Sequence, residues 1–168
     1  MDEHRGDDAE TPNDALDGPF LVDVMCGSLA TILRMCGYDT AYALDRGIEA
    51  DDALRALADD EGRALLTRDR DLGAGDGAVT LSATDTDAQL SQLAARGLDL
   101  GLPDVPRRCS ACNGVLERVE SGPTPDGVPD LDERPVWRCP DCSQFFWRGS
   151  HWDAVADRIA AITADRNA

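Results

Sequence analysis

Two kinds of apolar block alternate along the first hundred residues of the chain. Continuously apolar or β-branched blocks predict buried strands of a parallel sheet, which is covered on both faces. These strands are expected at Phe20–Val22, Thr40–Leu44, Ala64–Thr67 and Ala78–Leu81. Between them, apolar residues three and four positions apart predict amphipathic helices. The helices are expected at Ser28–Cys36, at Asp51–Glu61 and from Thr84 to Gly97.

Strands and helices follow one another in the order strand, helix, strand, helix, strand, strand, helix. This alternation favours an α/β fold, a mostly parallel sheet flanked by helices. Thr84, with Asp87 three residues later, resembles a capping box that opens the last of these helices. Ligands of such sheets bind outside the carboxyl ends of the strands. Asp23 and Asp69 each stand just past a predicted strand, so both are expected at that edge.

The two ends of the chain differ from this central part. Residues 1–19 lack periodicity and carry many acids, which predicts a disordered acidic arm with order beginning at Phe20. After a linker with two prolines near residue 102, the pattern changes to cysteine pairs, turns and a helix predicted over Trp152–Thr163. We therefore expect an α/β domain at 20–101 and a small Cys-rich module with a C-terminal helix at 102–168.

The chain has 16 arginines, no lysine and 33 acidic residues, so its formal net charge is −17. The missing lysine excludes four classes of protein: P-loop NTPases, protein kinases, phospho-aspartate receivers and Schiff-base enzymes. Each of these needs a lysine in its site. The acidity also argues against a nucleic-acid or lipid footprint built from a basic face.

This acidic composition, with arginine as the only strong cation, is typical of a protein from a very salty cytoplasm, where salt screens the repulsion among carboxylates. The alternative is an acidic surface that serves a basic partner. The first residues lack the cationic start and apolar stretch of a signal peptide. The longest apolar-rich run, Val24–Leu33, is too short to span a bilayer. We expect a cytoplasmic protein with no membrane partner.

Four of the six cysteines form two Cys-x-x-Cys pairs, Cys109 with Cys112 and Cys139 with Cys142. Two such turns bring four thiolates around one ion, and a tetrahedron of four sulfurs suits zinc in a closed structural site. The predicted product is a zinc ribbon whose intervening loop forms a hairpin with an extended tip. A rubredoxin-like iron site and redox-active dithiol pairs are the alternatives.

Other residues of interest have a structural and a functional interpretation. Cys26 and Cys36 are expected to be small buried apolar side chains rather than redox centres. His151 follows Ser150, a candidate helix cap, and is expected to be a structural hydrogen-bond partner because four cysteines already satisfy zinc. Most aromatic residues of the Cys-rich module are expected in its thin core, and one or two are candidates to stack on bases. These aromatic residues are Trp137, Phe145, Phe146, Trp147 and Trp152.

Four aspartates are candidates for a second metal site. Asp23 and Asp69 follow strands, Asp51 opens the helix after the second strand, and Asp71 lies two residues after Asp69. In an extended segment, residues two apart point the same way. Carboxylates with waters and substrate phosphate bind Mg²⁺ or Mn²⁺, and two such ions can drive phosphodiester hydrolysis. The alternative is that these acids belong to the solvated acidic surface.

Three segments resemble the PIN-like ribonuclease fold, FLVDVMCGSLATILRMCGYDT, DDALRALA and GRALLTRDRDL. Together with RCSACNGVL and CPDCSQFFWRGSHW, they make residues 20–158 similar to the mut-seven C-terminal RNase family, a PIN-like domain fused to a zinc ribbon. The resemblance implies RNA cleavage with Mg²⁺ or Mn²⁺. Asp23 is then the first-strand acid, Asp51 the acid opening the second helix, and Asp69 and Asp71 the acids of a Thr-Arg-Asp-x-Asp motif.

The chain departs from the family pattern at Cys26 and Ser28, where relatives tend to have Leu and a basic residue. This departure removes one phosphate contact. Arginines elsewhere in the chain are the remaining candidates for contact with phosphate. The alternative is that each of them only pairs with neighbouring acids. These candidates are Arg34, Arg68 and Arg70 in the α/β domain, and Arg107 and Arg108 beside the first cysteine pair.

The first hypothesis is a metal-dependent ribonuclease with a preference for single-stranded RNA, in which the zinc ribbon places RNA across the acidic site. The second is a non-catalytic module that binds RNA or protein and carries a degenerate acidic site. A phosphatase with an aspartyl nucleophile fits poorly, because Val24 and Met25 follow Asp23 and no second Asp stands two residues on. Endo- or exonucleolytic mode, oligomeric state and a regulatory protein partner are left open.

Overall fold

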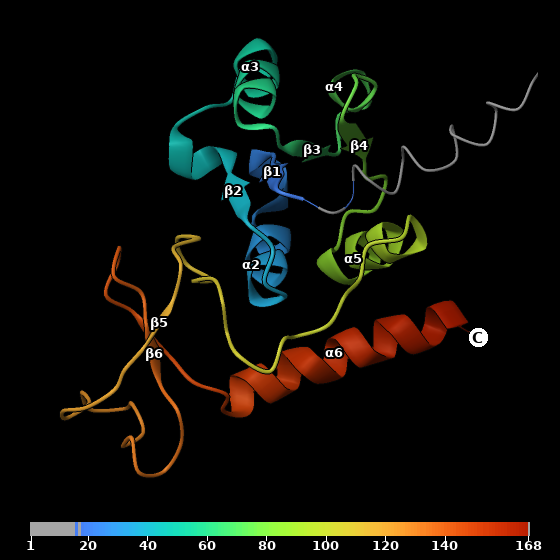
Figure 1. Cartoon of the computed structure of the whole chain (residues 1–168). Coiled ribbons are helices and arrows are strands. Elements are labelled where there is room, and N and C mark those ends of the chain that lie inside the picture. The colour runs from blue at the N-terminus through green and yellow to red at the C-terminus, as the bar shows by residue number, and fades with distance from the viewer. Residues whose placement is uncertain (1–15, 17, 168) are drawn as a thin grey trace, which may run out of the picture.

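Four short parallel strands form the central sheet in the computed structural model, which describes residue 16 and residues 18–167 (Figure 1). The strands run in the order β2-β1-β3-β4. They are β1 (Phe20–Val22), β2 (Thr40–Tyr42), β3 (Ala64–Thr67) and β4 (Ala78–Thr80). The two inner strands, β1 and β3, are paired in register from Phe20 opposite Ala64 to Val22 opposite Leu66. The predicted parallel sheet is confirmed.

Helices cover both faces of this sheet (Figure 1). On one face lie α2 (Gly27–Met35), α5 (Thr86–Ala95) and α6 (Ser150–Asn167), which share a core with Phe20 and Val22. On the other face lie α3 (Asp51–Glu61) and the single turn α4 (Arg70–Gly73), which pack on Leu21. Successive residues of β1 therefore pack in the cores on opposite faces of the sheet. Because both faces are buried, every residue of this strand is apolar. None of the helices described here is long and apolar enough to cross a membrane.

Several element ends differ from the sequence-based expectations. β2 ends at Tyr42, and the next residues form the 3₁₀ helix η3 (Ala43–Arg46), which closes on Gly47 in the left-handed conformation. The last helix of the α/β domain is capped by Asp85, whose side chain accepts the N–H of Ala88 at 3.2 Å. The predicted cap at Thr84 was wrong by one residue, because an ionised Asp is an equally good cap.

The first folded residue and the start of the C-terminal helix also differ from the sequence-based expectations. Leu16 is only 2% exposed and packs in the core beneath α2, so the folded part begins before Phe20. The rest of the predicted acidic arm, residues 1–15 and 17, lies outside the described residues. At the other end, α6 already begins at Ser150, so Ser150 is inside the helix and the Gly149 carbonyl accepts the N–H of Asp153.

The Cys-rich module forms a three-stranded antiparallel sheet in the order β5-β6-β7. Its strands are β5 (Glu117–Arg118), β6 (Trp137–Arg138) and β7 (Phe145–Phe146). Its small core consists of Cys109, Leu116, Trp137 and Cys139. From this module α6 returns along the α/β part and packs against α5 (Figure 1). Its buried Val155, Ile159 and Ile162 belong to the same core as α2.

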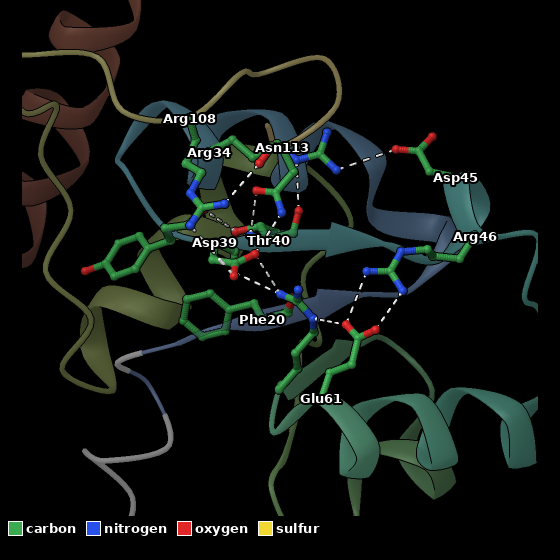
Figure 2. Close-up of polar contacts among 11 residues, drawn as sticks. Phe20, Arg34, Asp39, Thr40, Asp45, Arg46, Glu61, Arg108 and Asn113 are labelled. Atoms are coloured by element: carbon green, nitrogen blue, oxygen red, sulfur yellow. Dashed lines mark hydrogen bonds and ion pairs between the residues drawn. The ribbon is translucent and has the colours of Figure 1, made fainter. Parts of the chain in front are cut away.

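Asn113, in the first cysteine turn, docks this module on the edge strand β2 (Figure 2). Its side-chain oxygen accepts the backbone N–H of Thr40 at 2.9 Å, and its side-chain nitrogen donates to Asp39 at 2.8 Å. Thr40 is the first residue of β2, so this amide side chain satisfies one backbone N–H on the edge of the sheet.

Arg63 and Arg34 complete the docking contact around Asp39 and Thr40 (Figure 2). Arg63 donates to the Asp39 carboxylate at 2.9 Å and to the Phe20 carbonyl at 3.1 Å. Arg34, 4% exposed, donates to the carbonyls of Thr40 at 2.9 Å and Ser110 at 3.2 Å. Because Ser110 lies in the first cysteine turn, Arg34 joins the α/β part to the Cys-rich module directly.

Asp39 is the charged centre of this contact. Burial alone would raise the pKa of its carboxyl group, but hydrogen bonds from Asn113 and Arg63 and the charges of Arg63 and Arg108 hold it below the ordinary 3.8. A carboxylate with a lowered pKa stabilises the fold above its ordinary pKa, and this stabilisation is lost as the pH falls through the lowered value.

We predict that Asp39→Asn lowers the free energy of unfolding at pH 7 by about 1 kcal/mol, because the ion pairs of a partly exposed carboxylate are weakened by solvent. The difference from the parent protein should shrink below pH 3.8, where Asp39 itself becomes protonated. Urea unfolding at several pH values and constant salt measures both. Asp60→Asn, at an exposed acid of α3, is the control. A pH-independent difference would contradict the assigned role of the charge.

Candidate metal sites at the sheet edge and in the cysteine turns

Asp23 occupies the carboxyl end of the central strand β1. Its backbone N–H donates to the Leu66 carbonyl at 3.0 Å and so continues the pairing with β3. One side-chain oxygen accepts the N–H of Val24 at 2.7 Å, which caps the 3₁₀ helix η2 (Val24–Cys26). The other accepts the hydroxyl of Thr67 at 2.7 Å. The side chain is buried, since Asp23 is 7% exposed.

Thr67 connects Asp23 to Asp69. It is the last residue of β3, fully buried, and its hydroxyl oxygen also accepts the N–H of Asp69 at 3.0 Å. Two successive hydrogen bonds thus fix the second acid relative to the first. Sequence reasoning missed Thr67. A hydroxyl residue that ends a buried strand two positions before a candidate acid is the signal that identifies it.

Asp69 and Asp71 do not lie in an extended segment, so the expectation that their side chains point the same way was wrong. Asp69 is the N-cap of α4, and its carboxylate accepts the N–H groups of Asp71 at 2.9 Å and Leu72 at 3.2 Å. Asp71 therefore stands in the first turn of a helix. The chain turns here because an Asp at this position competes well for backbone N–H groups.

The four candidate aspartates are not gathered into one tight cluster. Asp51 is exposed at the start of α3, after η3, and Asp71 is exposed in α4. Within residues 16 and 18–167, only the four cysteines form a group of three or more possible ligands whose atoms lie within 4.8 Å of one another. The structure thus joins Asp23 and Asp69 through Thr67, and leaves Asp51 and Asp71 exposed in the first turns of α3 and α4.

Ion pairing separates these acids from others in the chain. Asp39, Asp45, Glu61 and Asp87 each lie within 4 Å of an arginine nitrogen. Among the ion pairs of the described residues, none involves the four candidate acids. A buried carboxylate is normally paired with a cation or bound to a metal. Asp23 is therefore a buried carboxylate with two hydrogen bonds and no ion pair among the described residues, which makes it a candidate ligand for a cation.

Cys26 lies beside this site. Burial raises the pKa of its thiol, the Asp23 charge adds to that effect, and the charge of Arg68 opposes it. Burial also raises the pKa of Cys36 to about 11. Both thiols are therefore poor nucleophiles at neutral pH, as expected for cysteines that serve as apolar side chains.

The candidate phosphate-binding arginines fall into two groups. Arg34 is buried with its guanidinium committed to two carbonyls and to Asp45 at 3.5 Å, which suits docking and not RNA binding. Arg108 similarly donates to the Asn113 carbonyl at 3.1 Å, although its side chain is 26% exposed. Arg68 is half-buried and donates to the Ala83 carbonyl at 3.1 Å, whereas Arg70 and Arg107 are exposed.

The four cysteines converge from two turns. Cys109 and Cys142 have their sulfurs 3.6 Å apart, and Cys112 and Cys139 have theirs 3.5 Å apart. A zinc ion with four sulfurs at about 2.3 Å has sulfur–sulfur edges of about 3.8 Å, so the spacing fits this ion. Cys109 and Cys139 are buried, whereas Cys112 and Cys142 reach the surface. These residues could hold one zinc ion with no open position.

The two cysteine turns share one backbone design. In the first, Asn113 donates its N–H to the Cys109 carbonyl, and in the second, Ser143 donates to the Cys139 carbonyl. Asn113 and Ser143 both adopt positive φ, 75° and 70°. A Cβ on Gly114 would lie 2.7 Å from the Cys139 sulfur, so only glycine fits there. The tight turns predicted after each pair are confirmed.

One comparison with known proteins identified a family. The model of the Mut7-C RNAse domain family matches residues 19–159. Searches of curated proteins and of solved structures returned no match. The matched segment contains the parallel sheet, the Asp23–Thr67–Asp69 connection and the four cysteines, and it agrees with the resemblance drawn from the sequence. The chain belongs to the Mut7-C RNAse domain family.

Proposed function

We propose that the protein is a metal-dependent ribonuclease of the PIN-like kind that hydrolyses single-stranded RNA at the carboxyl edge of its parallel sheet. The observation that carries this proposal is the buried Asp23 carboxylate, which accepts two hydrogen bonds but has no cation partner among the described residues. Membership of an RNase domain family supports the same reaction. Asp23 and Asp69 are the central ligands, with Asp51 and Asp71 at the rim.

The donor set fits Mg²⁺ or Mn²⁺. These ions prefer oxygen ligands and need only one or two carboxylates, since waters and substrate phosphate complete their coordination. An ionised carboxylate has about four acceptor sites, so Asp23 retains capacity beyond its bonds to Val24 and Thr67. When bound, the ion would act as a Lewis acid on the phosphate and would lower the pKa of a bound water.

The chain's own residues hold this site rigid. The Thr67 hydroxyl donates to the Asp23 carboxylate while it accepts the backbone N–H of Asp69, and the N–H groups of Asp71 and Leu72 hold the Asp69 carboxylate. The bond from Arg68 to Ala83 holds a guanidinium near Cys26 and the sheet edge. In a chain without lysine, Arg68 and the exposed Arg70 are the cations we assign to RNA phosphate.

The four cysteines bind one zinc ion in this proposal, and the zinc ribbon assists RNA binding. Their role is structural, because four sulfurs leave no position for substrate. Zinc fixes the turn that carries Asn113, and Asn113 fixes the module against β2. Arg107, exposed beside the first pair, is the module's candidate contact with the RNA backbone.

A second candidate function is a non-catalytic module that binds RNA or protein. The observation in its favour is that no three of the candidate carboxylates in the described chain come within 4.8 Å of one another. In that case Asp23 would serve only to cap η2 and bind Thr67. The two functions differ in whether the protein cleaves RNA at a rate that depends on Asp23.

We predict that Asp23→Asn and Asp69→Asn each reduce the rate of Mn²⁺-dependent cleavage of single-stranded RNA at least about 100-fold. Loss of a residue that only supports metal ligands already costs about 10–100-fold. An amide keeps the shape of both side chains, and Asn at position 69 still caps α4. The measurement is the initial cleavage rate of labelled RNA in matched salt.

Asp52→Asn is the matched control, because Asp52 is an exposed acid next to Asp51 and outside the proposed ligand set. Its rate should stay within about twofold of the parent rate, since a solvated charge on a surface contributes little. Unchanged zinc content and thermal unfolding would show that all variants fold. If the Asp23 and Asp69 variants cleave RNA as fast as Asp52→Asn, cleavage does not occur at this site and the proposal fails. Binding of RNA by the parent without any cleavage would favour the non-catalytic module.

We also predict that the purified protein contains one zinc ion per chain. Cys112→Ser should lose it and unfold at lower temperature, because metal binding and folding of such modules are coupled. Native mass spectrometry and thermal melts measure both. Cys36→Ser, which changes a thiol outside the cysteine quartet, should keep the zinc. Iron in place of zinc, or two disulfides and no metal, would refute the assignment.

A further inference from the structure

An aromatic cavity of about 290 Å³ lies where the Cys-rich module meets α2 and α6. Its apolar walls include Phe145, Phe146 and Trp147 from β7 and the residue after it, and Trp152 from the first turn of α6. Met35, at the end of α2, contributes from the α/β part. Phe146 packs against the module's core and Trp152 against the main core, but all four aromatic side chains are only half-buried, so each keeps part of its surface accessible. Trp137, in contrast, is 5% exposed.

Polar groups line the same cavity. The side chains of Gln144, Ser150 and His151 border it, together with Arg108. Gln144 and Ser150 offer both donors and acceptors, and His151 offers a ring nitrogen of each kind when neutral. Aromatic faces combined with donors and acceptors of this sort match a flat heterocycle with a polar edge.

The charge of the lining also favours an anionic ligand. No Asp or Glu lines this cavity, whereas Asp59 and Asp76 line the larger cavity beneath α3. The chain carries 33 acids and has a net charge of −17. A cavity lining with one arginine and no acid therefore differs in charge from what this composition would give on average. Arg107 follows Pro106, another lining residue, and is exposed. Because Arg108 is engaged with Asn113 and Asp39, a phosphate attached to the heterocycle would be bound by the exposed Arg107.

We infer that this cavity binds one unpaired base of single-stranded RNA, stacked on the Trp147 side, with the adjoining phosphate at Arg107. The volume is at the lower end for ligand cavities and suits one ring system rather than a folded peptide segment. The inference rests on the proposed ribonuclease function, for which it supplies a base-binding subsite separate from the acidic edge.

The position of the Trp147 ring depends on Gly149. A Cβ on Gly149 would lie 2.7 Å from its indole nitrogen, so the ring packs against the bare backbone of this glycine. Gly149→Ala must therefore displace the indole without removing it. Gly149 has no positive φ, so alanine is compatible with the backbone there. This variant tests the position of the ring separately from its presence.

The test is equilibrium binding of a fluorescein-labelled oligouridylate to the full-length zinc-loaded protein without divalent metal, followed by Mn²⁺-dependent cleavage. Trp147→Leu should weaken binding about 10-fold, since base–aromatic stacking is worth about 1–3 kcal/mol per base. Gly149→Ala should weaken it in the same direction. Cleavage at saturating RNA should keep its parent kcat, with a raised KM. Val105→Ala, at an exposed apolar residue outside the cavity lining, is the control.

Zinc content and thermal unfolding verify that each variant folds. If both cavity variants bind RNA like Val105→Ala, the inference is overturned and the cavity belongs to another ligand, such as a protein segment, while the ribonuclease proposal stands. An abasic strand of the same length tests the base itself. If the parent binds the abasic strand more weakly than the oligouridylate, and Trp147→Leu binds the two strands equally, base stacking is supported. If the parent neither binds nor cleaves RNA, both proposals fail.

Discussion

The side-chain amide of Asn113 holds the two parts of the molecule together, and much of the structure depends on it. The cysteine turn forces Asn113 into a left-handed conformation, and this conformation presents its amide to the start of β2. Arg34 and Arg63 then bind carbonyl and carboxylate groups on either side. Because α6 leaves the Cys-rich module and enters the main core, a shift of the module would disturb the packing of α6 as well.

Ion pairs with arginine distinguish the acidic residues of this chain from one another. The acids that dock elements, such as Asp39 and Glu61, each have arginine partners, and two arginines lower the pKa of Glu61 to about 2. Asp23 is buried at the end of the central strand without such a partner among the described residues. In a chain with one strong cation type and 33 acids, this difference, and not the net charge, is the reason we propose a divalent ion at Asp23.

Periodicity predicted the sheet, the helices and the two cysteine turns, because a strand buried on both faces and a Cys-x-x-Cys turn leave local signals. The positions of the aspartates after strands and at a helix start made them candidates, the resemblance to a family gave each a role, and their ligand role is still a prediction. Thr67 and the conformation at Asp69 were missed, since both depend on hydrogen bonds between residues on different elements or across a turn. The docking roles of Arg34 and Asn113 were also missed, because their partners lie over 70 residues away along the chain.

The most direct measurement for the central claim is a crystal of the zinc-loaded protein soaked in Mn²⁺, with anomalous diffraction recorded at the manganese and zinc edges. The account predicts manganese bound to carboxylate oxygens of Asp23 and Asp69 at about 2.2 Å, and zinc alone among the four cysteines. Manganese absent from Asp23 and Asp69 at a concentration that supports RNA cleavage would contradict it.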